Sequence, residues 1–178
     1  MRLPPGTVVG PVRPGANGVI PGHLLPSVQP FHSLVYPLDI REMQELARCY
    51  AGRATLTARA ASLPCFAMPS LNPGERLRVG YVSSDFGNHP LSHLMQSVFG
   101  MHDKSRFEVF CFALSPNDGS AWRAKIEREV EHVEDLTPLN FADCARLINS
   151  RRIHVLINLN GYTKGARNEI FALRPAPV

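Results

Sequence analysis

The stretch that decides the fold is residues 77–95, which read LRVGYVSSDFGNHPLSHLM. Its first six residues form a mainly apolar run that is typical of a buried strand. A polar turn follows, and a helix is expected to begin at Pro90, because proline at the first helical position sacrifices no hydrogen bond. Polar groups between the end of a strand and the start of a helix are typical of sites in open α/β sheets.

Three more strand-like runs follow, and helical patterns separate them. The sequence predicts strands over 77–82, 107–113, 132–136 and 154–159. Helical spacing predicts one helix over 91–101 and two more that carry Trp122, Ile126, Val130 and Val133, and Phe141, Cys144, Ala145 and Ile148. Strands that alternate with such helices form parallel sheets, so the expected fold class is a Rossmann-like α/β sheet.

The loops that follow the strands are expected to lie at one edge of this sheet, because parallel strands all end there. They span residues 83–89, 114–119 and 158–164. The second ends in Asp118-Gly119-Ser120, a turn followed by a helix cap, and either Thr137 or Asn140 is suited to cap the next helix.

The N-terminal part has a different character. Eight of the 16 prolines precede residue 38, so residues 1–37 are expected to be irregular. Residues 38–75 are expected to hold a helix capped by Asp39, followed by a linker. Residues 76–178 form the Rossmann-like part, which is expected to be incomplete because four strands are few for such a sheet.

Composition excludes several function classes. The net charge is +4, but residues 71–178 carry 13 basic against 12 acidic side chains, so no nucleic-acid partner is expected. There is no run of 18 apolar residues and no signal-peptide pattern, so no membrane partner is expected. The four cysteines have no metal-ligand spacing, which favours a reducing, intracellular compartment with Cys111 and Cys144 in the core.

Asp85 and His89 are the sharpest candidates for catalysis. The positive potential at a helix N-terminus favours a neutral imidazole, which accepts a proton or hydrogen-bonds a sugar hydroxyl, and Asp85 orients it or takes the proton. The plainer interpretation is a polar turn whose side chains only cap the helix. His93, four residues later, has neither a glutamate partner nor a third ligand at a readable spacing, so no metal site is expected.

A second polar loop, residues 158–167, follows the last predicted strand. Lys164 and Arg167 are suited to a phosphate or an acidic peptide, whereas a solvated helix start ordinarily prefers acids. Its candidate binding residues are Asn160, Tyr162, Thr163, Lys164 and Arg167. Neither a GxGxxG nor a GxxxxGK[ST] pattern is present, which argues against dinucleotide and ATP chemistry.

Three long motifs resemble the protein O-linked N-acetylglucosamine (O-GlcNAc) transferase family. They are RVGYVSSDFGNHPLSHLM at 78–95, FEVFCFALSP at 107–116 and INLNGYTKGARNE at 157–169, and the ending FALRPAP at 171–177 matches too. The resemblance covers about residues 24–178. PSVQPFHS at 26–33 and the leucine after Pro90 are most similar to the plant branch called secret agent.

The resemblance implies an entry segment and the first lobe of a glycosyltransferase B fold. The family transfers N-acetylglucosamine from UDP-GlcNAc to Ser or Thr hydroxyls of nuclear and cytoplasmic proteins, with inversion and without a metal or other cofactor. The second lobe, which holds most contacts to the UDP, is not matched. We therefore expect this chain to be inactive alone.

The motif match assigns roles to single residues. Asp85 and His89 correspond to the family's active-site aspartate and histidine, and His93 to a histidine in the same cleft. Lys164 and Arg167 correspond to a basic loop facing the acceptor peptide. Animal members read His-His-Ser where this chain has Phe31-His32-Ser33; Phe31 cannot act as a base, and His32 keeps the second position.

Two alternatives remain open on the sequence. One is a non-catalytic, truncated binding module that associates with a full-length partner or with itself through apolar surface. The other is a sugar-nucleotide epimerase of similar two-lobed shape.

Overall fold

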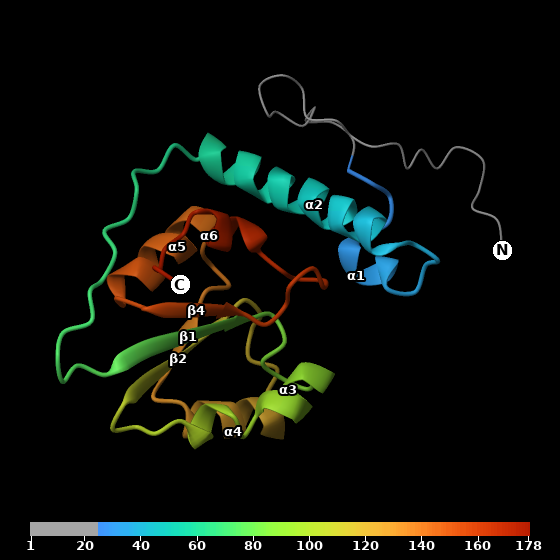
Figure 1. The fold of residues 1–178 in the computed structure, drawn as a ribbon. Coiled ribbons are helices and arrows are strands. Elements are labelled where there is room, and N and C mark those ends of the chain that lie inside the picture. Colours follow the sequence, from blue (N-terminus) through green and yellow to red (C-terminus); the bar gives the residue numbers. More distant parts are fainter. Residues whose placement is uncertain (1–24) are drawn as a thin grey trace. The chain divides into compact units, whose positions relative to one another are not determined.

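The structure is a computed structural model that describes residues 25–178 (Figure 1). The chain divides into two compact units, with the boundary between Thr57 and Ala58. The sequence predicts an irregular segment over 1–37, of which residues 1–24 lie outside the described residues. The prediction is wrong for Pro30–Ser33, which form the short helix α1 with proline at its start.

Helix α2 (Ile40–Ala60) begins where the sequence predicts. The Oδ1 atom of Asp39 accepts hydrogen bonds from the backbone N–H groups of Arg41 (2.8 Å) and Glu42 (2.9 Å). The Glu42 carboxylate accepts one from the Asp39 N–H in return (2.9 Å). This reciprocal capping satisfies donors that a helix start otherwise leaves unpaired.

Residues 58–178 are built on one parallel sheet, which confirms the predicted fold class. Its strands are β1 (Leu77–Ser83), β2 (Phe107–Ala113), β3 (His132–Asp135) and β4 (Val155–Asn158). Their order across the sheet is β3-β2-β1-β4, and every pairing is parallel. On the far side of β4, the Val178 N–H donates to the His154 carbonyl (3.2 Å) and the Val178 carbonyl accepts from the Leu156 N–H (2.7 Å).

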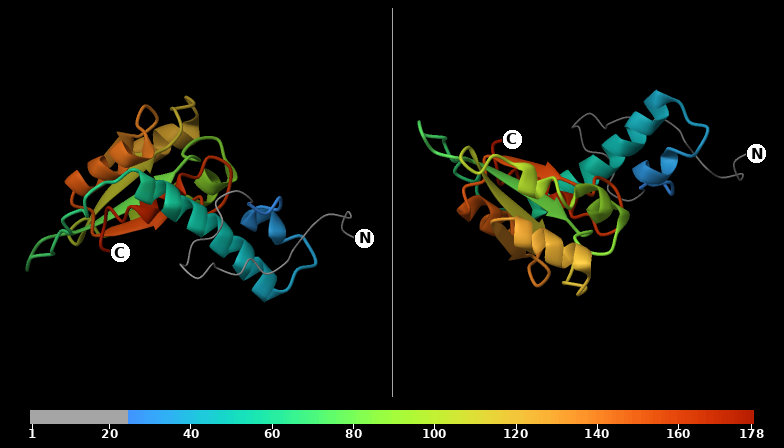
Figure 2. Two further views of the ribbon diagram at one scale, coloured as in Figure 1. Left: turned by 90° about the horizontal axis from the view of Figure 1, so that it is seen from above. Right: turned by 90° about the horizontal axis from the view of Figure 1, so that it is seen from below.

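Helices cover both faces of the sheet, as Figures 1 and 2 show. On one face lie α5 (Phe141–Ser150) and α6 (Asn168–Ala172). On the other lie α3 (Pro90–Met95), the 3-10 turn η1 (Phe99–Met101) and α4 (Ala121–Glu129).

The two buried clusters follow the period-two alternation of the strands. In β1, Val79 and Tyr81 belong to the cluster on the α3/α4 face, whereas Val82 belongs to the cluster on the α5/α6 face. In β2, Cys111 lies on the first face and Phe112 on the second, and neither is exposed. Both faces of the central strands are therefore closed, so polar groups reach the surface only at the strand ends.

Two helix predictions need correction. The helix predicted over 91–101 stops at Met95, where the bonding pattern tightens to i+3 contacts such as Val98 N–H to the Met95 carbonyl (2.9 Å). This tighter path buries Phe99, whose ring packs edge-on against those of Tyr81 (5.1 Å between ring centroids) and Phe86 (5.7 Å).

The second helix also ends earlier than its apolar spacing predicts. Helix α4 stops at Glu129, Val130 has an extended backbone, and Val133 belongs to β3. The predicted caps are present: Ser120 accepts from the Arg123 N–H (3.2 Å), and Asn140, the correct one of the two candidates, accepts from the Asp143 N–H (2.9 Å). No helix within residues 25–178 has the length and apolarity needed to cross a bilayer.

All four cysteines of the chain are free thiols. Cys111 and Cys144 are fully buried, which confirms their placement in the core. Burial raises the pKa of the Cys144 thiol, and it raises that of Cys111 strongly, because a low-dielectric core disfavours a thiolate. Both side chains therefore act as small apolar residues.

Gly80 offers a test of the central strand. A Cβ atom at this position would lie 2.8 Å from Phe112 Cε2 and 3.0 Å from Leu156 Cδ1, both in the core. We expect Gly80→Ala to lower the free energy of unfolding by about 1–3 kcal/mol, the usual range for overpacking. Urea denaturation measures this change.

Gly100→Ala is the matched control, because its new Cβ would meet only one side chain, that of Glu129, whose Oε2 and Cβ lie 3.1 and 3.3 Å away. We expect a change within about 0.5 kcal/mol there. Equal effects of the two substitutions would contradict the close packing at Gly80.

Candidate active site

Loops that follow three different strands meet at the carboxyl edge of the sheet, as predicted. The loop after β1 is joined to the loop after β4, because the Ser84 N–H donates to Asn160 Oδ1 (2.8 Å). It is joined to the loop after β2, because the Asn88 N–H donates to Asp118 Oδ2 (2.7 Å). Residues separated by 76 and 30 positions thus form one polar surface.

The Asp85 side chain is held on both of its oxygens. Oδ1 accepts from Ser84 Oγ (2.9 Å), and Oδ2 accepts from Asn160 Nδ2 (2.8 Å). The Asp85 carbonyl also accepts from Ser92 Oγ (2.6 Å), which ties the turn to α3. With 14% of its side chain exposed, Asp85 is a carboxylate of defined orientation at the edge of the site.

His89 caps helix α3 through a ring nitrogen. Its Nδ1 accepts from the backbone N–H of Leu91 (3.2 Å) and lies 3.8 Å from Asp85 Oδ2. A backbone N–H can only donate, so in the neutral ring the proton must be on Nε2. Half of the side chain is exposed, so this geometry offers a hydrogen-bond donor outward. Capping and a role in the site are therefore compatible.

His93 lies beside the same turn. Its Nε2 is 3.2 Å from Asn88 Oδ1, and its ring contacts the Trp122 ring with centroids 4.3 Å apart. These contacts connect α3 to α4 and leave His93 exposed. Within residues 25–178, no three His, Cys, Asp or Glu side chains gather in a way suited to a metal ion.

The loop after β4 contributes side chains of unequal accessibility. Asn160 is buried, Tyr162 and Thr163 are half-buried, and Lys164 is exposed. Arg167 points its Nη1 into the protein, where it donates to the carbonyls of Leu136 (3.3 Å) and Leu139 (2.8 Å). Arg167 therefore secures this loop to the β3–α5 loop, while Lys164 presents its charge to solvent.

Asp118 is a residue of the site that the sequence shows only as part of a turn. Its carboxylate accepts from the N–H groups of Asn88 (2.7 Å) and Ser120 (3.0 Å), and these bonds lower its pKa from 3.8 to about 2. The loop before α3 passes so close that a Cβ on Gly87 would lie 2.5 Å from Asp118 Oδ2. In the sequence, the contact is indicated only by a glycine at position 87, which permits a close approach, and by an acidic residue in the turn at 118.

Three other histidines have structural contacts. His102 Nε2 lies 2.8 Å from the Tyr81 hydroxyl, and His132 Nε2 lies 2.8 Å from a Glu108 oxygen. His154 is buried, and its Nδ1 accepts from the Arg78 N–H (3.0 Å).

His32 belongs to the other unit, where it is exposed on α1. Its ring lies edge-on to that of Phe31, with centroids 5.8 Å apart. The structure therefore brings together the predicted residues of the two loops and leaves His32 as a separate prediction.

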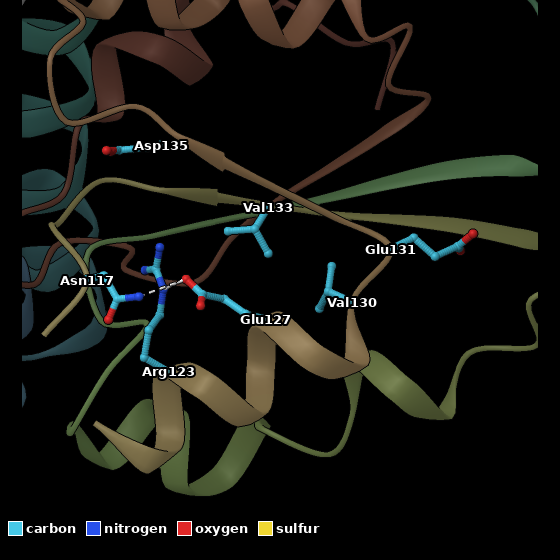
Figure 3. Close-up of a pocket in the computed structure, with 7 residues that line it drawn as sticks. All are labelled: Asn117, Arg123, Glu127, Val130, Glu131, Val133 and Asp135. Atoms are coloured by element: carbon cyan, nitrogen blue, oxygen red, sulfur yellow. Dashed lines mark hydrogen bonds and ion pairs between the residues drawn. The ribbon is translucent and has the colours of Figure 1, made fainter. Parts of the chain in front are cut away.

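A shallow cavity of about 470 Å³ lies between α4 and β3 (Figure 3). Arg123 and Glu127 point into it and form an ion pair of 2.7 Å, and Arg123 Nη1 also donates to the Phe86 carbonyl (3.2 Å). None of the predicted site residues lines this cavity. Arg123 is thus engaged by Glu127 and by the loop after β1, and this cavity is not the candidate site.

The fold and its carboxyl-edge site define an α/β domain of the class that binds ligands at loop clusters. The model of glycosyl transferase family 41 matches residues 20–178. The chain is 53% identical over 161 residues to a probable UDP-N-acetylglucosamine–peptide N-acetylglucosaminyltransferase SEC of Arabidopsis thaliana. It is 52% identical over 172 residues to the UDP-N-acetylglucosamine–peptide N-acetylglucosaminyltransferase of Caenorhabditis elegans.

A solved structure is similar as well. A mutant of the Thermobaculum terrenum O-GlcNAc transferase superposes with a TM-score of 0.61 at 28% identity, over 84% of this chain and 32% of that one. The chain belongs to glycosyl transferase family 41, which confirms the resemblance. The matches cover 87% and 86% of this chain but only 16% and 14% of the plant and nematode relatives.

The tautomer of His89 is directly testable. In the neutral ring we expect the proton on Nε2, because Nδ1 accepts from the Leu91 N–H. Two-dimensional ¹⁵N spectra of the imidazole groups distinguish the two tautomers. His154, whose Nδ1 also accepts from a backbone N–H, is an internal reference. A proton on Nδ1 of neutral His89 would contradict the capping geometry.

The hydrogen bond from the Asn88 N–H to the Asp118 carboxylate, which connects the loops after β1 and β2, is expected to weaken in acid. Because the folded pKa of about 2 lies below the ordinary 3.8, this carboxylate contributes stability above about pH 4, and the contribution is lost as the pH falls through 2. We expect the amide proton shifts of Asn88 and Ser120 to titrate together with a midpoint near 2. In Asp118→Asn these transitions should be absent. Midpoints near 4 in the original chain would show that the two hydrogen bonds do not form.

Proposed function

We propose that this chain is the part of a protein O-GlcNAc transferase that presents the acceptor hydroxyl to the sugar. The reaction moves N-acetylglucosamine from UDP-GlcNAc to a Ser or Thr hydroxyl of an intracellular protein. One observation carries the proposal: Asp85 and His89, from a motif shared with family 41, lie together at the carboxyl edge of a parallel sheet. The names of the plant and nematode relatives support the same donor and a peptide acceptor.

The two residues have different parts in the proposed step. The acceptor oxygen attacks the anomeric carbon, the bond from that carbon to UDP breaks, and the hydroxyl proton must leave. Asp85 is the acceptor for this proton, directly or through water, because its carboxylate is fixed in place and accessible at 14% of its surface. His89, protonated on Nε2, donates a hydrogen bond to a sugar or acceptor oxygen.

The proposed substrate contacts come from both loops. Lys164 is exposed and suited to an acidic or phosphate group, and Tyr162 and Thr163 flank it. His93 borders the same turn beside Asn88. Arg167 acts through the loop it secures, and His32 remains a proposed contact of the entry segment.

The proposal includes neither a metal nor another cofactor. The departing UDP carries negative charge and needs positive groups or donors around it. We place most of these in a second lobe, because the matches span only 16% and 14% of the two relatives. A nuclear and cytoplasmic location is part of the proposal, and the free thiols of all four cysteines support a reducing compartment.

A chimaera tests the proposal. The 178-residue chain replaces the matching segment of the Arabidopsis relative, and transfer from UDP-GlcNAc to a Ser-containing peptide is measured by mass spectrometry. We expect activity in the chimaera and none in the chain alone. Asp85→Asn should lower kcat by about 100-fold or more, the scale of lost proton transfer.

Asp103→Asn is the matched control, since this aspartate is exposed, its side chain accepts hydrogen bonds from the nearby Ser105, and it precedes β2. It should leave kcat unchanged. Full turnover by Asp85→Asn, or transfer by the isolated chain, would refute the proposal.

A further inference from the structure

We infer that Asn160 is a positioning residue, which sets the orientation of the Asp85 carboxylate and does not itself touch sugar or peptide. The polar loop pattern places Asn160 among the candidate binding residues, yet this residue is only 5% exposed. The inference rests on the proposed function in one respect, the naming of Asp85 as the reacting carboxylate. The hydrogen bonds that carry it do not depend on that function.

The orientation of the Asn160 amide follows from its neighbours. The Ser84 N–H can only donate, so the atom 2.8 Å from it must be the amide oxygen. The Nδ2 atom is then on the side of Asp85, at 2.8 Å from Oδ2. It also lies 2.9 Å from Ser84 Oγ and 3.2 Å from Thr163 Oγ1.

These contacts use the hydrogen-bonding capacity of the side chain. Two N–H groups face three acceptors, and the oxygen has a backbone donor. A buried amide in this state has no donor left for a ligand, so its effect on a reaction must pass through the groups it holds. Asp85 is the one charged group among them.

Asn160 and Ser84 donate hydrogen bonds to different oxygens of the Asp85 carboxylate. Asn160 Nδ2 donates to Oδ2, and Ser84 Oγ donates to Oδ1 (2.9 Å). Rotation of the carboxylate about its Cβ–Cγ bond would break both hydrogen bonds, which leaves one orientation. In this orientation Oδ2 lies on the side of His89, 3.8 Å from Nδ1.

The loop after β4 is shaped to keep Asn160 in place. Asn158 Oδ1 accepts from the N–H groups of Asn160 and Gly161, each at 3.0 Å. Gly165 has φ +86°, and a Cβ there would lie 2.6 Å from Ser84 Oγ. Only glycine therefore lets Ser84 sit between this loop and Asp85.

An exchange of the two side chains tests the contact in the chain as it stands. Asn160→Asp keeps an oxygen for the Ser84 N–H but sets a second carboxylate against Asp85, and we expect the melting temperature to fall. Asp85→Asn combined with Asn160→Asp restores one amide and one carboxylate, and it should recover most of that loss. Asn158→Asp combined with Asp85→Asn is the control, and its melting temperature should not rise above that of Asn158→Asp alone. Failure of the exchange to recover stability would overturn the inference.

Turnover in the chimaera separates positioning from substrate contact. We expect Asn160→Asp and Asn160→Ala to lower kcat by about 10- to 100-fold, the effect of a misplaced reacting group. The KM values for UDP-GlcNAc and peptide should stay within about twofold, because no contact with bound substrate is lost. The stabilised exchange variant should remain inactive, because its carboxylate is on the wrong residue.

A large rise in either KM with unchanged kcat would show direct substrate binding by Asn160 and would overturn the inference. A failed proposed function has a different signature, which is full turnover in Asp85→Asn alone. The melting data on the exchange variants would still report whether Asn160 holds Asp85.

Discussion

The hydrogen bonds of the buried Asn160 side chain are the constraint on which the site depends. They join the turn after β1 to the loop after β4, two segments brought side by side by the parallel pairing of these strands. An amide suits this position because it satisfies the Ser84 N–H with its oxygen and the Asp85 carboxylate with its nitrogen. A carboxylate at this position would leave Asp85 without its donor, and an aliphatic side chain would leave both half-buried groups without this partner, at a cost of about 1–3 kcal/mol for each.

The β1 turn is held from its other side by a charge instead of an amide. Asp118 accepts from the Asn88 N–H, and Gly87 lets the two loops approach closely. Asp85 takes part in the first attachment and His89 directly follows the second, within a turn that is itself tied to α3 by Ser92. A reacting carboxylate on such a turn needs little reorganisation when substrate binds, which is the advantage of a preorganised site.

The strands and the position of the site could be predicted from sequence because both follow from local patterns. The apolar run Val79-Gly80-Tyr81-Val82 is typical of a strand that is buried on both faces, and Asp85 and His89 follow where such a strand ends. The contacts of Asn160 and Asp118 are harder to predict, because a polar side chain in a glycine-containing loop is ordinarily expected to be solvated. Their partners lie 75 and 30 positions away in the sequence. The end of α3 was missed for a related reason, since Phe99 satisfies a helical pattern but is buried against Tyr81 and Phe86 through a tighter turn.

The distribution of charge fits the proposed role of this chain on one side of a transfer reaction. Glycosyl transfer needs an acceptor for the hydroxyl proton and positive groups for the departing diphosphate. At the carboxyl edge, Asp85 is well placed for the first task. Of the two cations that the loop after β4 offers, Arg167 is engaged by the Leu136 and Leu139 carbonyls and only Lys164 is exposed. A single lysine on a loop is too little to stabilise a diphosphate, so the proposed chemistry assigns the acceptor side of the reaction to this lobe and the leaving-group side to another.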